Sequence, residues 1–193
     1  MPRVTNTRER LLTTAGTLFY ERGIAATGVD AVVRESGVSK PTLYAQFHSK
    51  SELVAAVLRQ RHDDRAAQLQ AWVGGVEDPF ERPLAVFAWL EDFYRRAGTR
   101  GCAFLNAAAE LRDPDDAARR VVRDEKRWLL DYLAALARDA SLHEPDRLAS
   151  QLLLLVDGVA GRVVASGAAA APGAVADASG AARTLIDASS AKR

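Results

Sequence analysis

The amino-acid sequence predicts an all-α protein with about nine helices. Its composition is typical of helices, because Ala, Leu and Arg are abundant while Gly and Pro supply only 13 and 7 of the 193 residues. Apolar residues recur every three or four positions through most of the chain, which is the spacing of one helix face. No segment alternates apolar and polar residues as a half-buried strand would.

Cysteine content and hydropathy indicate the cellular compartment in which we expect the protein. The single cysteine, Cys102, excludes an internal disulfide and is typical of a reducing compartment. The N-terminal residues lack the apolar run of a secretory signal peptide. The longest apolar run near the C-terminus, Leu152 to Val156, is far too short to span a bilayer. We therefore expect a soluble, cytoplasmic protein without a membrane partner.

Charge is distributed unevenly along the chain. The formal net charge is only +1, so total charge does not by itself indicate a nucleic-acid partner. Residues 1–50, however, carry seven Lys or Arg against four Asp or Glu, whereas residues 51–193 carry 19 against 21. The positive excess therefore lies in the N-terminal segment, where it favours contact with phosphates.

The first three predicted helices are short and follow one another closely. Thr5 or Thr7 can cap the first helix, which ends at Gly23, and the second runs from Val29 to Ser36. Apolar residues at helical spacing give each helix a face to bury. We expect the three helices to share a core made of Leu11, Phe19, Val32, Leu43 and Phe47.

Residues 36–50 predict the turn and second helix of a DNA-binding helix-turn-helix. Gly37 can adopt positive φ, Ser39 is a good N-cap, and Pro41 falls in the first turn, where a missing N–H costs nothing. The inward face carries Leu43 and Phe47. Side chains left mainly to the other side are Lys40, Thr42, Tyr44 and His48. A short helix with outward donors suits a DNA major groove.

The rest of the chain predicts six further helices. Ser49 and Glu52 form a capping box that opens a long helix ending before Gly74-Gly75. Residues 113–116, an Asp-Pro pair and two acids, predict another helix start, because the helix dipole favours anions there. The other four helices are expected from Asp78-Pro79 to Gly98, from Cys102 to Leu111, from Leu148 to Ala165 and from Pro172 to Ser189.

The segment GVSKPTLYAQFHSKSEL, residues 37–53, is specific as a combination. Matching residues before it include Arg10, Leu11, Ala15, Leu18, Phe19, Gly23, Thr27, Val29 and Val32. The run from Thr7 to Leu58 resembles the N-terminal domain of TetR/AcrR-type transcriptional regulators. The resemblance implies a helix-turn-helix DNA-binding domain at residues 1–48 and an effector-binding and dimerisation domain at residues 49–193.

In that family the start of the recognition helix reads bases, while its far end and the next helix grip phosphates. The resemblance therefore implies base contacts by Lys40, Pro41 and Thr42 and phosphate contacts by Tyr44, His48 and Lys50. Thr27 and Ser39 are expected to add phosphate contacts. Pro41 departs from the family pattern, because members often carry a small residue there and proline removes a backbone donor. The implied partner is double-stranded operator DNA.

The resemblance also implies that the C-terminal helices enclose a small-molecule effector, in an apolar cavity with a few polar groups. The residues predicted to bind it are Trp89, Phe93, Phe104, Asn106, Glu110, Trp128, Tyr132 and Asp157. The alternative is that the aromatic residues are ordinary core and that the polar ones cap helices or face solvent.

The last two helices are amphipathic, and the resemblance implies that they pair with their copies as a four-helix dimer interface. Gly158 and Gly161, among many alanines, would let such helices approach closely. The residues predicted at this interface are Leu152, Leu155, Val159, Val163 and Leu185.

The sequence contains no catalytic or metal-binding constellation. His143-Glu144 is not followed by a second histidine, because Arg147 stands at the position that a zinc protease would need. Residues 113–116 lack the spaced oxygens of a Ca²⁺ loop, and neither a P-loop nor a GxSxG elbow is present. We therefore expect no enzyme activity, metal or cofactor.

The predicted function is that of a homodimeric repressor, released from a palindromic operator by a small-molecule effector. Three alternatives stay open. First, the same fold could serve an activator or a ligand-independent regulator. Second, it could belong to a family member recruited to work other than DNA binding. Cys102, with Arg100 nearby, could also act as a redox sensor, since a cation lowers the pKa of a thiol.

Overall fold

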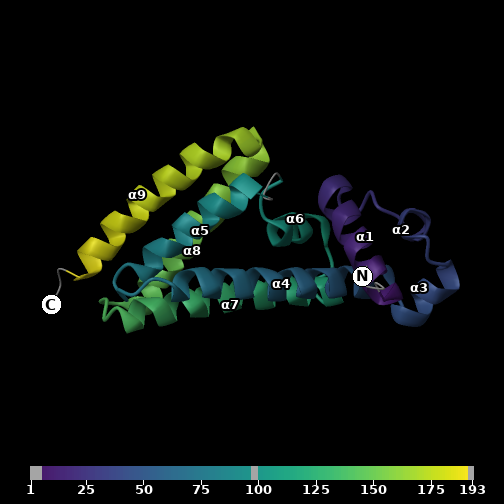
Figure 1. Cartoon of the computed structure of the whole chain (residues 1–193), viewed down its shortest axis with the longest axis horizontal. Helices are drawn as coiled ribbons and strands as arrows, with labels where there is room; N and C mark the ends of the chain where they lie inside the picture. The colour runs from purple at the N-terminus through teal and green to yellow at the C-terminus, as the bar shows by residue number, and fades with distance from the viewer. Residues whose placement is uncertain (1–5, 97–99, 191–193) are drawn as a thin grey trace, which may run out of the picture. The chain divides into compact units, whose positions relative to one another are not determined.

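The computed structural model describes residues 6–96 and 100–190, and these residues contain nine α-helices, one 3₁₀ turn and no strand (Figure 1). The predicted all-α architecture is confirmed. The helices are α1 (Thr7–Arg22), α2 (Val29–Ser36), α3 (Lys40–Gln46), α4 (Lys50–Gly74), α5 (Arg82–Arg96), α6 (Ala103–Glu110), α7 (Ala117–Asp139), α8 (Pro145–Ser166) and α9 (Ala171–Ser190).

The chain divides into two compact units. Unit 1 comprises Met1–Asp63 and Ala103–Asp124, and unit 2 comprises Asp64–Cys102 and Glu125–Arg193. Helices α4 and α7 each contribute residues to both units.

Unit 1 holds the three short N-terminal helices and α6. The five residues predicted to form its core are all buried, namely Leu11, Phe19, Val32, Leu43 and Phe47. The N-cap of α1 is Asn6, whose side chain accepts a hydrogen bond from the amide of Arg8. The prediction that Thr7 caps this helix is therefore wrong, and Thr5 lies outside the described residues. Asparagine is a strong N-cap because its side-chain oxygen satisfies a free amide of the first turn.

Two other helix starts show how side chains satisfy free backbone amides. At α4 the hydroxyl of Ser49 accepts from the amide of Glu52 at 3.1 Å, while the Glu52 carboxylate reaches back to the amide of His48 at 2.9 Å. The expected capping box is thus present, but its return bond, from the Glu52 carboxylate, reaches the amide of His48, one residue before Ser49. Helix α7 begins at Ala117 with Asp116 as its cap, rather than within residues 113–116, because Asp113 closes a separate turn before it.

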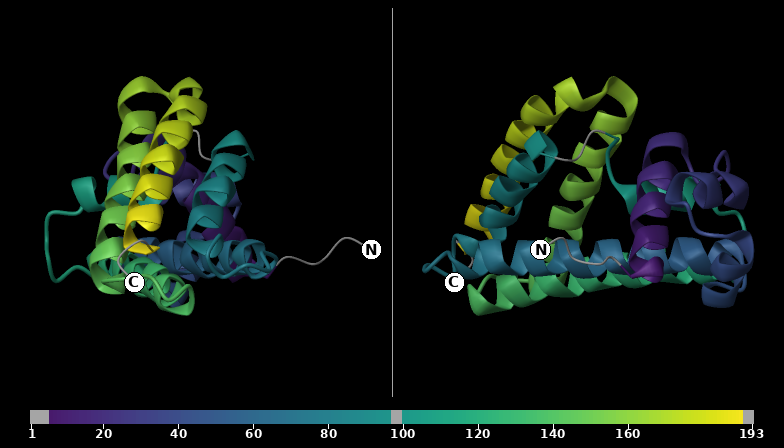
Figure 2. Two further views of the ribbon diagram at one scale, coloured as in Figure 1. Left: turned by 90° about the vertical axis from the view of Figure 1, so that its left-hand side faces the viewer. Right: turned by 45° about the vertical axis from the view of Figure 1, so that its right-hand side comes forward.

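Unit 2 contains α5, α8 and α9, and α9 packs against both of the others (Figure 2). Its core includes the fully buried side chains of Phe87, Trp89, Leu133, Leu148 and Leu152. Among the described residues, α8 is the one helix long and apolar enough to cross a membrane. Seven residues of α8 are nevertheless buried in the core of unit 2, as in an amphipathic core helix.

Candidate functional site

The turn between α2 and α3 sets the orientation of the recognition helix. Gly37 has φ of +64° and its amide donates to the carbonyl of Val33 at 3.0 Å, which ends α2 in a left-handed residue. Arg10 of α1 donates to the carbonyl of Ser36 at 2.5 Å. A Cβ added at Gly37 would meet the Arg10 guanidinium at 3.1 Å. Glycine is therefore favoured at this position by its φ and by the close approach of Arg10.

Helix α3 is capped and anchored as the sequence predicted. The Ser39 hydroxyl accepts from the amide of Thr42 at 3.3 Å and shares a hydrogen bond with the Thr42 hydroxyl at 2.7 Å. Leu43 and Phe47 point inward and are 0% and 3% exposed. Tyr44 on the opposite side is 41% exposed. The inward residues thus hold the helix while the other side stays open to a partner.

The side chains predicted to touch DNA gather on α3 and on the turn that follows it. Those with exposed side chains are Ser39, Lys40, Pro41, Tyr44 and His48, while Thr42 and Lys50 are half-buried. None of these seven is buried in the core of unit 1. The surface carries three hydroxyls, a histidine ring and two lysines, which are groups that hydrogen-bond to bases and phosphates.

Two of these side chains are held by acids in the free protein. The amino group of Lys40 lies 2.8 Å from the Asp30 carboxylate of α2, and this hydrogen bond raises the pKa of Lys40. His48 Nδ1 lies 3.0 Å from Glu52. The pKa of Glu52 is lowered, first by the hydrogen bond from the His48 amide and then by that from its ring. The sequence did not lead us to expect Asp30 as the partner of Lys40, although an acid in the first turn of α2 can be recognised from the sequence.

Thr27 does not belong to this surface, so its predicted phosphate contact is wrong. Its side chain is 1% exposed, and its hydroxyl lies 2.7 Å from the carbonyl oxygen of Gly23 and 3.3 Å from that of Leu18. The hydroxyl therefore ties the end of α1 to the loop before α2. A buried hydroxyl that donates to backbone is a structural group rather than a ligand for DNA.

Thr27→Val is expected to lower the free energy of unfolding by about 1 to 3 kcal/mol, because the buried carbonyls lose their donor. The same change is expected to leave the salt dependence of DNA binding unchanged, because no phosphate contact is lost. Chemical denaturation and titrations of DNA at several salt concentrations test the two halves. A shallower salt dependence in the variant would contradict the structural role.

Glu110 lies in unit 1, where its carboxylate accepts from the amide of Ala25 at 2.7 Å. It also lies against Gly23, where an added Cβ would meet it at 3.1 Å. This acid of α6 therefore holds the loop between α1 and α2. Phe104 and Asn106, predicted with it as effector ligands, belong to the same unit, where Phe104 is buried and Asn106 half-buried.

The other predicted effector residues, Trp89, Phe93, Trp128, Tyr132 and Asp157, lie in unit 2. Trp128 and Tyr132 stack with ring centroids 5.4 Å apart, and burial raises the pKa of Tyr132. Asp157 forms an ion pair with Lys126. Trp89 and Phe93 stack at 5.4 Å and lie beside a charged group that the sequence analysis did not single out.

That group is Arg65 of α4. Its guanidinium lies 5.4 Å from the ring centroid of Trp89 and 5.6 Å from that of Phe93. It also pairs with the carboxylate of Glu125 at 3.4 Å and approaches the Cys102 sulfur at 3.9 Å. The Glu125 side chain is only 2% exposed. Sequence reasoning missed this centre, because Arg59 to Arg65 has the composition of a solvated stretch. The available signal was that Arg65 precedes the core residue Leu69 by one helical turn.

Three of the five predicted dimer-interface residues lie inside the protomer. Leu152, Val159 and Val163 are at most 2% exposed and belong to the core of unit 2, so their assignment to a contact between protomers is wrong. Leu155 and Leu185 are half-buried against the same core. The outward face of α8 instead presents Leu154, Gly158, Gly161 and Ala165. A helix that is apolar on several sides does not show from its sequence which side faces the core.

Comparisons with known proteins agree with this arrangement. A family model described as bacterial regulatory proteins, tetR family, matches residues 11–57. The crystal structure of a TetR-family transcriptional regulator from Streptomyces coelicolor is similar with a TM-score of 0.87 and 30% identity, and the match covers 95% of this chain and 96% of that one.

Two curated relatives share shorter segments. The HTH-type transcriptional activator FasR of Mycolicibacterium smegmatis is 51% identical over 86 residues, which are 45% of this chain and 39% of FasR. The HTH-type transcriptional repressor ComR of Escherichia coli is 34% identical over 110 residues, which are 56% of this chain and 52% of ComR. The matched segments thus span about half or less of these two relatives.

Proposed function

Because this chain belongs to the TetR family of transcriptional regulators, we propose that it is a homodimeric repressor that a small-molecule effector releases from a near-palindromic operator. Regulators of this family bind operator DNA and act as dimers, and the family and its relatives are not enzymes. One observation carries the proposal. Helix α3 uses Leu43 and Phe47 to pack inward and leaves Lys40, Pro41 and Tyr44 exposed.

In the proposed complex the two α3 helices of a C2 dimer enter successive major grooves, roughly 34–36 Å apart. Lys40 donates to guanine acceptors, and the methyl group of Thr42 contacts thymine. Tyr44, His48 and Lys50 bind phosphates and fix the register of the helix. Asp30 keeps the amino group of Lys40 beside α3 before DNA arrives, since the two side chains already form an ion pair.

Lys40→Ala is expected to change the preferred bases and to weaken binding to the best operator by roughly tenfold per half-site. Tyr44→Phe and Lys50→Ala are expected to weaken binding to all sequences, and Lys50→Ala also to reduce the salt dependence, because phosphate contacts carry no sequence information. Selection of bound DNA from a random pool, followed by titrations of the selected site, measures both effects. A base preference that survives Lys40→Ala unchanged would overturn the role of this lysine.

We assign the dimer contact to the outward face of α8, with the neighbouring face of α9. Leu154 is 70% exposed, which is unusual for a large apolar residue unless a partner covers it. Gly158 and Gly161 follow it at spacings of four and three, so the three residues form one stripe. Small residues in such a stripe let a second helix approach closely.

We place the effector in unit 2 and the DNA contact in unit 1, with α4 as the connection, since it belongs to unit 1 up to Asp63 and to unit 2 from Asp64. Effector binding would move α4 and change the separation of the two α3 helices. Effector and operator would then oppose each other by linkage. A regulator that binds DNA in the cytoplasm accounts for the single reduced cysteine.

An activator on the same fold is the second candidate. It is favoured by the 51% identity to a segment of FasR, which is an activator. A transcription assay with the selected operator placed at or upstream of a promoter distinguishes the two signs. Repression by the free protein, relieved by an effector, supports the first proposal, and stimulation supports the second.

A further inference from the structure

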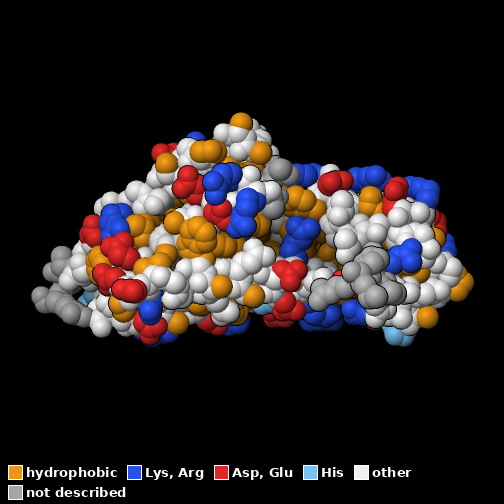
Figure 3. Space-filling model, in the orientation of Figure 1, with side chains coloured by type: hydrophobic (Ala, Val, Ile, Leu, Met, Phe, Trp, Pro, Cys, Tyr) orange, Lys and Arg blue, Asp and Glu red, His pale blue; other side chains and the backbone are white. Residues whose placement is uncertain are grey.

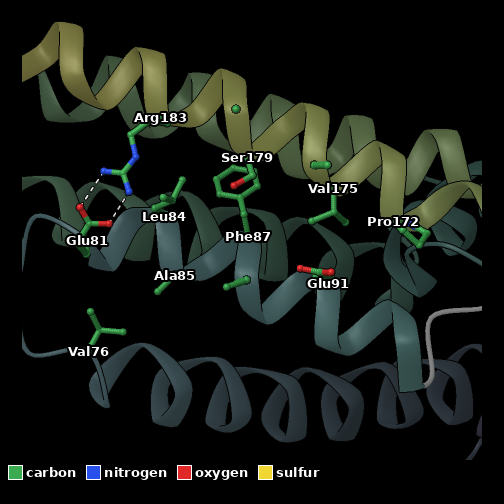
Figure 4. A pocket seen from close by; sticks show the side chains of 13 residues that line it. Val76, Glu81, Leu84, Ala85, Phe87, Glu91, Pro172, Val175, Ser179 and Arg183 are labelled. Carbon is green, nitrogen blue, oxygen red and sulfur yellow. Dashed lines mark hydrogen bonds and ion pairs between the residues drawn. The ribbon is translucent and has the colours of Figure 1, made fainter.

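Unit 2 contains a groove of about 570 Å³ between α5 and α9 (Figure 4). Its lining comes from the loop before α5 and from these two helices, and none of the effector residues predicted from the sequence lies in it. The volume falls within the range of about 300 to 1,000 Å³ that is typical of small-molecule sites.

The floor of the groove is apolar. The apolar lining groups that reach solvent are Leu84 and Ala88 of α5 and Pro172 and Ala176 of α9. Phe87 and Val175 also line the groove but are at most 3% exposed. Figure 3 shows hydrophobic side chains open to the surface over α5. Such a floor favours an apolar or aromatic ligand body, because covering it removes hydrocarbon surface from water.

The charged groups of the groove lie at its two ends (Figure 4). At one end Arg183 donates two hydrogen bonds to the Glu81 carboxylate, at 2.8 and 2.5 Å. These bonds lower the pKa of Glu81 and raise that of Arg183, so both groups stay ionised and neutralise each other. The pair therefore adds no net charge to the groove.

Glu91 supplies the charge at the other end. Its side chain is exposed and lines the groove toward Pro172, and no described residue forms a hydrogen bond or an ion pair with it. The groove thus combines an apolar floor with one uncompensated carboxylate. An anionic ligand would be repelled there, whereas a cation would gain a partner.

We infer that this groove binds an amphipathic monocation, with its apolar body on Leu84, Ala88 and Pro172 and its ammonium group at Glu91. Ser179 lines the middle of the groove and offers a hydroxyl to a second polar group of the ligand. As an effector site the groove rests on the function proposed above. Because α9 also packs against α8, a ligand wedged against α9 would act on the helices assigned to the dimer contact.

The test uses the full-length protein without DNA and three probes that share one skeleton, namely biphenylbutylamine, biphenylbutanol and biphenylbutanoate. Isothermal titration calorimetry is expected to show that the protonated amine binds about threefold to tenfold more tightly than the alcohol, and the carboxylate more weakly than both. Glu91→Gln keeps the shape of the side chain and is expected to abolish the preference for the amine. Asp131→Asn, which removes an exposed carboxylate of α7 outside the groove, is the matched control and is expected to retain it.

Ala88→Phe fills the groove from its exposed edge and is expected to abolish binding of all three probes. Equal affinities for amine and alcohol, or binding that survives Ala88→Phe, would overturn the proposal. The proposal would also be overturned if no probe bound the wild type and Ala88→Phe dissociated the dimer. That result would mean that a second copy of the chain occupies the groove. Gel shifts with operator are scored separately. If the amine binds through Glu91 but does not release DNA, the ligand site stands and the proposed effector response fails.

Discussion

Gly158→Arg is expected to leave the protein monomeric and to reduce operator affinity by about 10²- to 10⁴-fold, the gain that two linked binding modules provide. The protomer itself has room for the new side chain, because no atom lies within 4 Å of a Cβ built at Gly158. The arginine should therefore leave the core of unit 2 intact. It would instead occupy the outward stripe of α8 that starts at Leu154, where a second copy must approach closely.

Sedimentation velocity and fluorescence anisotropy with the selected operator measure these two effects. Ala135→Arg is the matched control, since it places the same side chain at an exposed position of α7. The control is expected to remain dimeric and to bind DNA as the wild type does. A dimeric Gly158→Arg variant with full affinity would move the contact between protomers to another face.

Arg65→Met is expected to lower the free energy of unfolding by about 3 to 5 kcal/mol, because it removes the guanidinium that pairs with the buried carboxylate of Glu125. Glu125 is 2% exposed, so water cannot replace the guanidinium. Methionine keeps much of the apolar length of arginine, which isolates the loss of charge from the loss of volume. The aromatic rings of Trp89 and Phe93 also lose the cation beside them.

Urea denaturation at one fixed protein concentration measures this loss, since dimerisation contributes to the apparent stability. The double variant Arg65→Met/Glu125→Leu is expected to recover most of it, because neither charge then remains buried. Arg95→Met removes an exposed arginine that pairs with Asp92 and is expected to have no measurable effect. An Arg65→Met variant as stable as the wild type would mean that Glu125 reaches water.

The predicted recognition helix illustrates what local sequence signals achieve. Ser39, Pro41 and the spacing of Leu43 from Phe47 define the start, direction and inward face of α3 within a few residues of chain. The outward-facing residues then follow, because successive side chains are placed around a helix with a fixed period of about 3.6 residues. The exposed surface of the candidate site was therefore predictable, with Thr27 as the exception.

The ion pair and the groove of unit 2 were not predictable in the same way. Arg65 and Glu125 are 60 residues apart, and each stands in a charged segment. The lining of the α5–α9 groove likewise combines residues near position 84 with residues near position 176. No pattern within one helix specifies such pairings, because they depend on which helices pack together.

The sequence by itself determined the helical class, most helix boundaries and the side of α3 that faces outward. These features depend on contacts within one or two helical turns, namely caps, dipoles and apolar spacing. Only the tertiary structure decided that Thr27 is buried, that Arg65 lies in an apolar core and that Leu154 rather than Leu152 faces outward. Leu152 to Val156 are apolar on every side of α8, so only packing against α9 and the rest of unit 2 selects the buried face.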